Sequence, residues 1–279
     1  MTIKKETHET LFTFYEISKR LKNGELTIGK VVMNHLQTCY EHEKNVLSDF
    51  IRDFCEYNGI EEGTEESVKA FLAFNQTVFS RMFKEFNVEV VSDSFFDCLN
   101  GTNLDSALNK VNLYKEFGEC AGTLLFPDGI MQYAITSEGA LFRYFPNAGT
   151  KFYYSYDFDD VDFKKYSAVE DIYNPYFCQT LKVLMIKKYG EVETTLVGKG
   201  VRRVFGDEVV VNRTPFPVHR LDSSWFKTII RTEGFMVRGF WRLQPCGKGR
   251  KERRLTFIQP FMKHGYKRIA PALKARSSA

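Results

Sequence analysis

The stretch AGTLLFPDGIMQYAITSEGALFRYFPNAGTKFYYSY, Ala121 to Tyr156, decides the fold. Short aliphatic and aromatic runs alternate in it with Asp-Gly, Glu-Gly and Asn-Ala-Gly, which are typical of tight turns. Apolar runs separated by such turns indicate antiparallel strands joined by hairpins. The stretch therefore predicts a β-meander of about four strands.

The sequence before the meander has the periodicity of helices. Apolar residues recur three and four positions apart, which places them on one face of a helix. This spacing predicts three helices, through Leu11–Leu21, Ile28–Phe54 and Val68–Phe86.

Signals for helix ends support these helices. Asn23-Gly24 and Asn58-Gly59 suit the left-handed residue that ends many helices. Thr64, followed by two glutamates, suits an N-cap with acidic residues in the first turn. A fourth, shorter helix is expected from about Leu104 to Phe117, ended by Gly118.

The sequence after the meander is less uniform. Residues 157–172 are acidic and irregular, and periodicity does not decide whether residues 175–190 form a helix or a buried strand. Strand-like sequence then returns in residues 192–198, in residues 201–212 with a turn at Gly206-Asp207, and in residues 219–245.

These patterns predict an α+β protein. A helical region (1–118) is followed by an antiparallel β-meander region (119–200) and a basic, β-rich C-terminal region (201–279). With 43% hydrophobic and 15% aromatic residues, the chain has enough apolar surface to fold into a globular protein.

Composition also bears on the compartment. No stretch reaches the roughly 20 apolar residues that cross a bilayer, and the start, MTIKKETHETLF, is charged and unlike a signal peptide. We expect a cytoplasmic protein with no membrane contact. The six cysteines are dispersed and are expected to be reduced thiols.

Charge is distributed unevenly along the chain. After residue 200 there are 18 Lys/Arg against 5 Asp/Glu (+13), which leaves 21 against 30 (−9) for residues 1–200. The basic part can contact an acidic partner, either nucleic acid or protein. It can also pair with the acidic part of the same chain or of a second subunit, so a homo-oligomer is one expectation.

Two groups of residues have the composition of metal sites. His35, Cys39 and His42 are residues of types that bind zinc, and they are spaced to lie along one helix. A fourth ligand is missing nearby, and His35 and Cys39 lie on the stripe of residues that faces the core. A magnesium-dependent nuclease needs clustered carboxylates, and the chain has such a cluster at Asp157, Asp159, Asp160 and Asp162. An acidic surface loop is the simpler explanation of the aspartates, so we assign no metal and expect no cofactor.

The sequence contains no catalytic motif that we recognise. GxSxG, HExxH and GxxxxGK[ST] are absent, and Gly247-Lys248-Gly249 is too short for a phosphate-binding loop. A lone Gly-x-Gly is typical of a hairpin turn. The sequence therefore favours a non-enzymatic protein and leaves a scattered nuclease site open.

The strongest binding candidate is VRGFWRLQPCGKGRKERRLTFIQPF, residues 237–261. Cations interleaved with aromatic rings suit either a nucleic-acid backbone with stacked bases or an acidic protein patch. A hairpin with buried aromatic residues and a solvated basic tip is the simpler alternative. The candidate binding residues are Arg238, Phe240, Trp241, Arg242, Lys248, Arg250, Lys251, Arg253 and Arg254.

The run from Leu221 to Arg268 resembles the C-terminal segment of largely uncharacterised proteins of phages, plasmids and other bacterial mobile elements. That group often has Arg-Gly-His-aromatic-Arg, then Gly-x-Gly, then a strand with Ile-x-x-Phe; this chain has RGFWR, GKG and IQPF. A looser form of the ending is similar to that of a type V-A anti-CRISPR inhibitor family. Phe240 stands where the group commonly has His, which favours binding over catalysis here.

The resemblance implies a mobile-element protein acting in the cytoplasm of a bacterial host. The leading hypothesis is a non-enzymatic protein that binds and inhibits a host anti-phage defence complex, by occlusion or by assembling around it. A nucleic-acid-binding accessory protein and a magnesium-dependent nuclease are the alternatives.

Overall fold

The structure, a computed structural model, describes most of the N-terminal part of the chain and separate segments of the rest. The described residues are 2–101, 110–147, 152–158, 161–162, 174–189, 193–198, 204–205, 208–210, 214–222, 235–237, 239–247, 252–258, 261–264 and 267–269.

The three expected N-terminal helices are confirmed as α1 (Lys5–Lys22), α2 (Ile28–Asn58) and α3 (Glu65–Lys84). Gly59 ends α2 in the left-handed conformation, with φ 66°. The Thr64 side chain accepts a hydrogen bond from the backbone N–H of Ser67 and so caps α3, as expected.

The β-meander is also confirmed. Its strands are β4 (Cys120–Phe126), β5 (Gly129–Thr136), β6 (Gly139–Pro146) and β7 (Tyr153–Asp157), each antiparallel to the next. Because the strands follow one another through short turns, they lie side by side in chain order.

The meander is part of a larger sheet. Three further strands, β2 (Val88–Val91), β12 (Val218–Asp222) and β9 (Glu193–Gly198), extend it to seven strands in the order β7-β6-β5-β4-β2-β12-β9. β2 is parallel to both β4 and β12, and the other pairs are antiparallel. The sheet thus draws strands from all three predicted regions, whose boundaries remain a compositional prediction.

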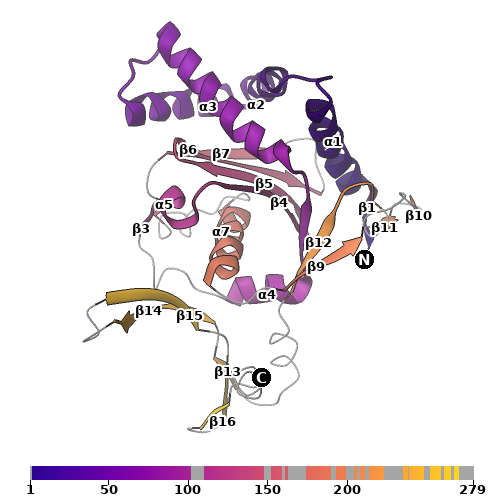
Figure 1. The fold of residues 1–279 in the computed structure, drawn as a ribbon, viewed down its shortest axis with the longest axis vertical. Coiled ribbons are helices and arrows are strands. Elements are labelled where there is room, and N and C mark those ends of the chain that lie inside the picture. The colour runs from indigo at the N-terminus through magenta and orange to yellow at the C-terminus, as the bar shows by residue number, and fades with distance from the viewer. Residues whose placement is uncertain are drawn as a thin grey trace.

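Helices cover both faces of this sheet (Figure 1). α1, α2 and α3 lie on one face, and α7 (Asn174–Tyr189) and α4 (Asp93–Gly101) lie on the other. Neighbouring residues of one strand enter different cores: Leu141 packs with α1–α3, and Phe142 packs with α7. This alternation places an apolar core on each side of the sheet.

The undecided segment 175–190 is helical. In α7 the four consecutive residues Val183–Ile186 are all buried. A helix that is covered on several sides has no polar face, so its sequence lacks the 3.6-residue period that identifies a surface helix.

The prediction of one helix from Leu104 to Phe117 is wrong. Lys110–Val111 forms a short strand, β3, which pairs with β8 (Val161–Asp162), and of the described residues 110–117 only Leu113–Phe117 are helical (α5). The predicted stop at Gly118 is correct. Residues 102–109 lie outside the described residues.

The remaining strands form small sheets. β10 and β11 pair around the expected turn at 206–207, which itself lies outside the described residues, and β11 also pairs with β1. The bounds are β1 (Thr2–Lys4), β10 (Val204–Phe205), β11 (Glu208–Val210), β13 (Phe235–Val237), β14 (Phe240–Cys246), β15 (Glu252–Ile258), β16 (Phe261–His264) and β17 (Lys267–Ile269). The α+β class is confirmed. In the described part of the chain, no helix is long and apolar enough to span a membrane.

We predict that Gly129→Ala destabilises the protein. A Cβ at this position would lie 2.6 Å from the Phe145 carbonyl oxygen and 2.7 Å from Cε2 of Tyr144, so the β5–β6 pair would have to shift. Overpacking of this kind costs ~1–3 kcal/mol, measurable as a lower urea midpoint. Gly29→Ala is the control because its Cβ has open space beyond Gln76 at 3.8 Å. A midpoint for Gly129→Ala that is no lower than that of the wild type would contradict the prediction.

Candidate functional site

The predicted basic hairpin is formed by β14 and β15. The strands pair antiparallel, with Phe240 opposite Ile258 and Cys246 opposite Glu252. Gly247 follows β14 with φ 75°, a turn conformation that glycine adopts without strain. Of the predicted binding residues, Phe240, Trp241, Arg242, Arg253 and Arg254 lie in the two strands, and Arg238, Lys248, Arg250 and Lys251 lie outside the described residues.

The two faces of this hairpin differ in exposure. Phe257 is buried in the core beside α7, and the register places Trp241 opposite it. Side chains alternate between faces along a strand, and the other face presents Arg242, Gln244 and Arg254 to solvent. We call these three residues the basic face. It is held in place by the burial of Phe257.

The end of the molecule where α2 meets α3 carries dense negative charge. Residues 41–66 contain nine Asp/Glu against Lys44 and Arg52, and we call this segment the acidic end. All nine acidic side chains are exposed: Glu41, Glu43, Asp49, Asp53, Glu56, Glu61, Glu62, Glu65 and Glu66. The acidic end and the basic hairpin lie on opposite sides of the central sheet (Figure 1).

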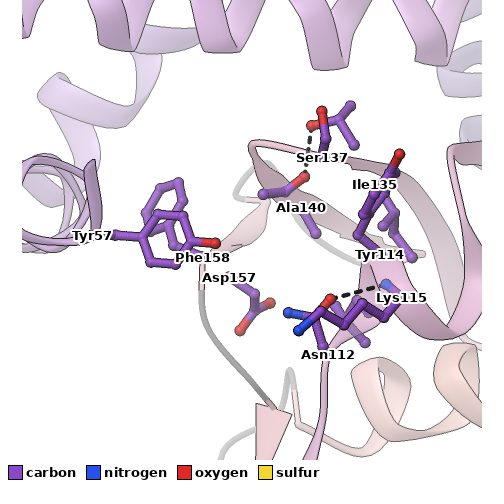
Figure 2. A pocket seen from close by; sticks show the side chains of 12 residues that line it. Tyr57, Asn112, Tyr114, Lys115, Ile135, Ser137, Ala140, Asp157 and Phe158 are labelled. Atoms are coloured by element: carbon purple, nitrogen blue, oxygen red, sulfur yellow. Dashed lines mark hydrogen bonds between the residues drawn. The ribbon is translucent and has the colours of Figure 1, made fainter.

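A pocket of about 160 Å³ opens beside the acidic end. It lies where the end of α2, the start of α5, the β5–β6 turn and the end of β7 meet, and we call it the rim pocket. Figure 2 shows two aromatic rings on one side, residues of α5 on the other and a carboxyl group between them; these are Tyr57, Phe158, Asn112, Tyr114, Lys115 and Asp157. The rings of Tyr57 and Phe158 stack with centroids 6.4 Å apart.

Local sequence builds the walls of the rim pocket. The Asn112 side chain accepts a hydrogen bond from the backbone N–H of Lys115 and so caps α5. Gly139 has φ 141°, and a Cβ there would lie 2.8 Å from the ring of Phe158. Glycine at this position therefore lets the ring lie against the β5–β6 turn. Of these wall residues, only Asp157 was a candidate from the sequence, because the others come from distant parts of the chain.

Two of the four predicted aspartates lie in different strands. Asp157 ends β7 and lines the rim pocket, whereas Asp162 lies in β8; Asp159 and Asp160 lie outside the described residues. Among the residues that the structure describes, no three His, Cys, Asp or Glu form a group that could hold a metal ion. The nuclease hypothesis stays a prediction from the sequence.

The three zinc-type residues of α2 have different environments. His35 and Cys39 are buried, with Sγ 3.6 Å from the imidazole nitrogens, whereas His42 is exposed. His35 Nε2 lies 3.2 Å from the Tyr156 hydroxyl, which donates to Asn75 Oδ1 at 2.7 Å. His35 and Cys39 therefore belong to a polar network between α2, α3 and the sheet.

Arg143 is the charged member of this region. Its guanidinium lies 4.9–5.2 Å from the ring centroids of Phe79, Phe145 and Phe152, and Nη1 donates to Gln132 Oε1 at 3.3 Å. Ring faces carry partial negative charge and so stabilise the buried cation. Burial nevertheless lowers the pKa of Arg143 to about 10. No sequence pattern indicated this site, because an arginine between apolar strand residues is usually exposed.

Burial favours the neutral forms of both the thiol and the imidazole. Burial raises the pKa of Cys39 to about 12, and burial followed by the charge of Arg143 lowers the pKa of His35 well below 6.5. A nucleophilic cysteine needs its thiolate form. The pair therefore acts as part of the core and not as a catalytic dyad.

Comparison with known proteins does not assign the chain to a family. No known protein family matches the chain, and no curated protein matches it significantly. The crystal structure of AcrVA2 aligns with 94% of this chain and 100% of that chain, with a TM-score of 0.42 and 11% sequence identity. Similarity at this level does not identify a shared site or partner.

We predict that His35 makes stability fall at acidic pH. The unfolded chain binds a proton at His35 below pH 6.5, whereas the folded chain, with a lowered pKa, does not. The free energy of unfolding therefore decreases as pH falls below this value, by up to about 1.4 kcal/mol per pH unit.

The measurement is urea unfolding between pH 7.5 and pH 5, values bracketing the usual histidine pKa at ~6.5. His35→Gln should flatten the pH dependence, and His42→Gln, which changes an exposed histidine of the same helix, should keep it. Identical slopes for the two variants would show that His35 does not carry the effect.

Proposed function

We propose that the protein binds a protein complex of a bacterial host, an anti-phage defence complex, and inhibits it by occlusion or by assembling around it. The observation that carries this proposal is the pair of exposed surfaces of opposite charge, the acidic end and the basic face, on opposite sides of one sheet.

Exposed charges of both signs on one protein favour a protein partner. A polyanion such as nucleic acid is attracted by the basic face and repelled by the nine carboxylates of the acidic end. A protein complex offers surfaces of both signs, and complementary charges speed encounter and select the partner. The same two surfaces allow copies of this chain to associate, which is the form that assembly around a target would take.

Sequence resemblance supports the biological setting. The segment Leu221–Arg268, which resembles endings of mobile-element proteins and, more loosely, of a type V-A anti-CRISPR inhibitor family, contains β14 and β15. The basic face therefore belongs to the part of the chain on which the resemblance rests.

We predict that the protein restores phage growth on bacteria protected by a type V-A CRISPR system with a matching spacer. Changing both Arg242 and Arg254 to Glu should reduce this effect, because attraction at the basic face becomes repulsion. Efficiency of plaquing is the readout, with protein level measured by immunoblot.

The matched control is Lys19→Glu with Arg20→Glu. It makes the same change of charge at two exposed residues of α1, whose side chains are 53% and 51% exposed. Full plaquing with the Arg242/Arg254 variant would remove the basic face from the mechanism. Failure of the folded wild-type protein to restore plaquing would refute inhibition of this defence system.

Nucleic-acid binding is the second candidate, favoured by the exposure of Arg242 and Arg254 on one face. If it holds, labelled DNA or RNA should bind at ~50 mM salt and dissociate steeply as salt is raised, because phosphate contacts release counterions. Fluorescence anisotropy measures this. Absence of binding at low salt would exclude this candidate for the nucleic acids tested.

A further inference from the structure

The rim pocket has the size of one side chain. Its volume is about 160 Å³, whereas pockets for drug-sized ligands measure roughly 300–1,000 Å³. A site this small, open to the surface beside exposed helix ends, suits a single residue projecting from a larger partner.

The aromatic wall of the pocket suits a cation. Tyr57 is 44% exposed, and its ring is backed by the buried ring of Phe158. The faces of aromatic rings attract ammonium and guanidinium groups within about 6 Å. The backing ring holds Tyr57 in the pocket wall, where it is accessible to a ligand.

The polar part of the pocket also favours a cation. Asp157 places a carboxyl group between the aromatic wall and α5 (Figure 2). Carboxylates form short, charge-assisted hydrogen bonds with guanidinium groups. Asp53 and Glu56 precede Tyr57 in the acidic end and add to the negative potential at the mouth.

Lys115 is the opposing charge. Among the described residues that line the pocket it is the single cation, and it is exposed. A lysine ammonium sits on a flexible stem and is strongly hydrated, so it can leave the mouth when a ligand enters. Its presence should weaken, but not prevent, the binding of a second cation.

We propose that the rim pocket binds an arginine side chain of the protein partner, and that the partner presents this arginine on a basic surface that docks on the acidic end. The proposal deepens the proposed function and rests on it for the partner being a protein. Under this proposal, a basic surface of the partner contacts the acidic end. A separate acidic surface of the partner contacts the basic face.

The test uses N-acetyl-arginine methylamide as the probe and follows the backbone amide resonances of Tyr114, Lys115, Ser137 and Gly139 by NMR on the full chain. N-acetyl-citrulline methylamide is the neutral isostere and N-acetyl-glutamate methylamide the anionic comparison. We expect saturable shifts with the arginine probe and about tenfold weaker binding of the citrulline probe, because the charge-assisted bond and the cation–π contact are lost.

Variants locate the site. Asp157→Asn and Tyr57→Leu should each weaken arginine binding, and Lys115→Gln should strengthen it. Tyr40→Leu is the control, because Tyr40 is an exposed tyrosine of α2 (52%) outside the pocket. Tyr57 is exposed enough that Tyr57→Leu remains informative if Asp157→Asn fails to fold.

Several results would overturn the proposal: equal binding of the citrulline probe, preference for the glutamate probe, or unchanged arginine binding by both Tyr57→Leu and Asp157→Asn. The proposed function fails separately. If the wild-type protein binds the arginine probe but does not restore plaquing, inhibition is refuted and the pocket remains an arginine-binding site. If both pocket variants restore plaquing fully, the pocket has no role in inhibition, but the proposed inhibition itself stands.

Discussion

Burial of both faces of the central sheet is the constraint on which the structure depends. All eight residues of β5 are buried, so neither face of this strand can be left to water. Covering them requires apolar layers on both sides, which α1–α3 supply on one and α7 and α4 on the other. Burying a large apolar side chain contributes about 1.5–3 kcal/mol, so the two cores together provide the main stabilisation.

Buried polar side chains in this sheet are partly compensated by their surroundings. Arg143 and Gln132 are neighbours on β6 and β5, and three phenylalanine rings enclose the guanidinium. The cost of burying His35 is avoided by keeping it neutral. The same principle separates core from surface in this molecule: the charges of the acidic end and the basic face remain exposed to water.

Local signals in the sequence were sufficient for elements that local interactions determine. The Gly59 and Thr64 caps and the meander turns at Asp128-Gly129 and Glu138-Gly139 depend on residues close in the chain, and these were predicted correctly. The third predicted turn, at 147–149, lies largely outside the described residues. The short strand Lys110–Val111 was missed because its pairing with residues 161–162 is a long-range contact. The rim pocket was missed for the same reason: Tyr57, Asn112 and Asp157 meet only after folding. The basic hairpin was foreseen, but which of its faces is exposed depends on the burial of Phe257.

The parallel pairing of β2 with β12 joins residues 88–91 to residues 218–221. A ribosome must therefore synthesise more than two thirds of the chain before the sheet can close on this side, and until then β2 has an unpaired edge. Long-range pairing of this kind slows folding, because a large loop must close before its contacts form. A chain interrupted before Val218 would expose an apolar strand edge and be prone to aggregation, so synthesis of the whole chain and its solubility are linked by this one pairing.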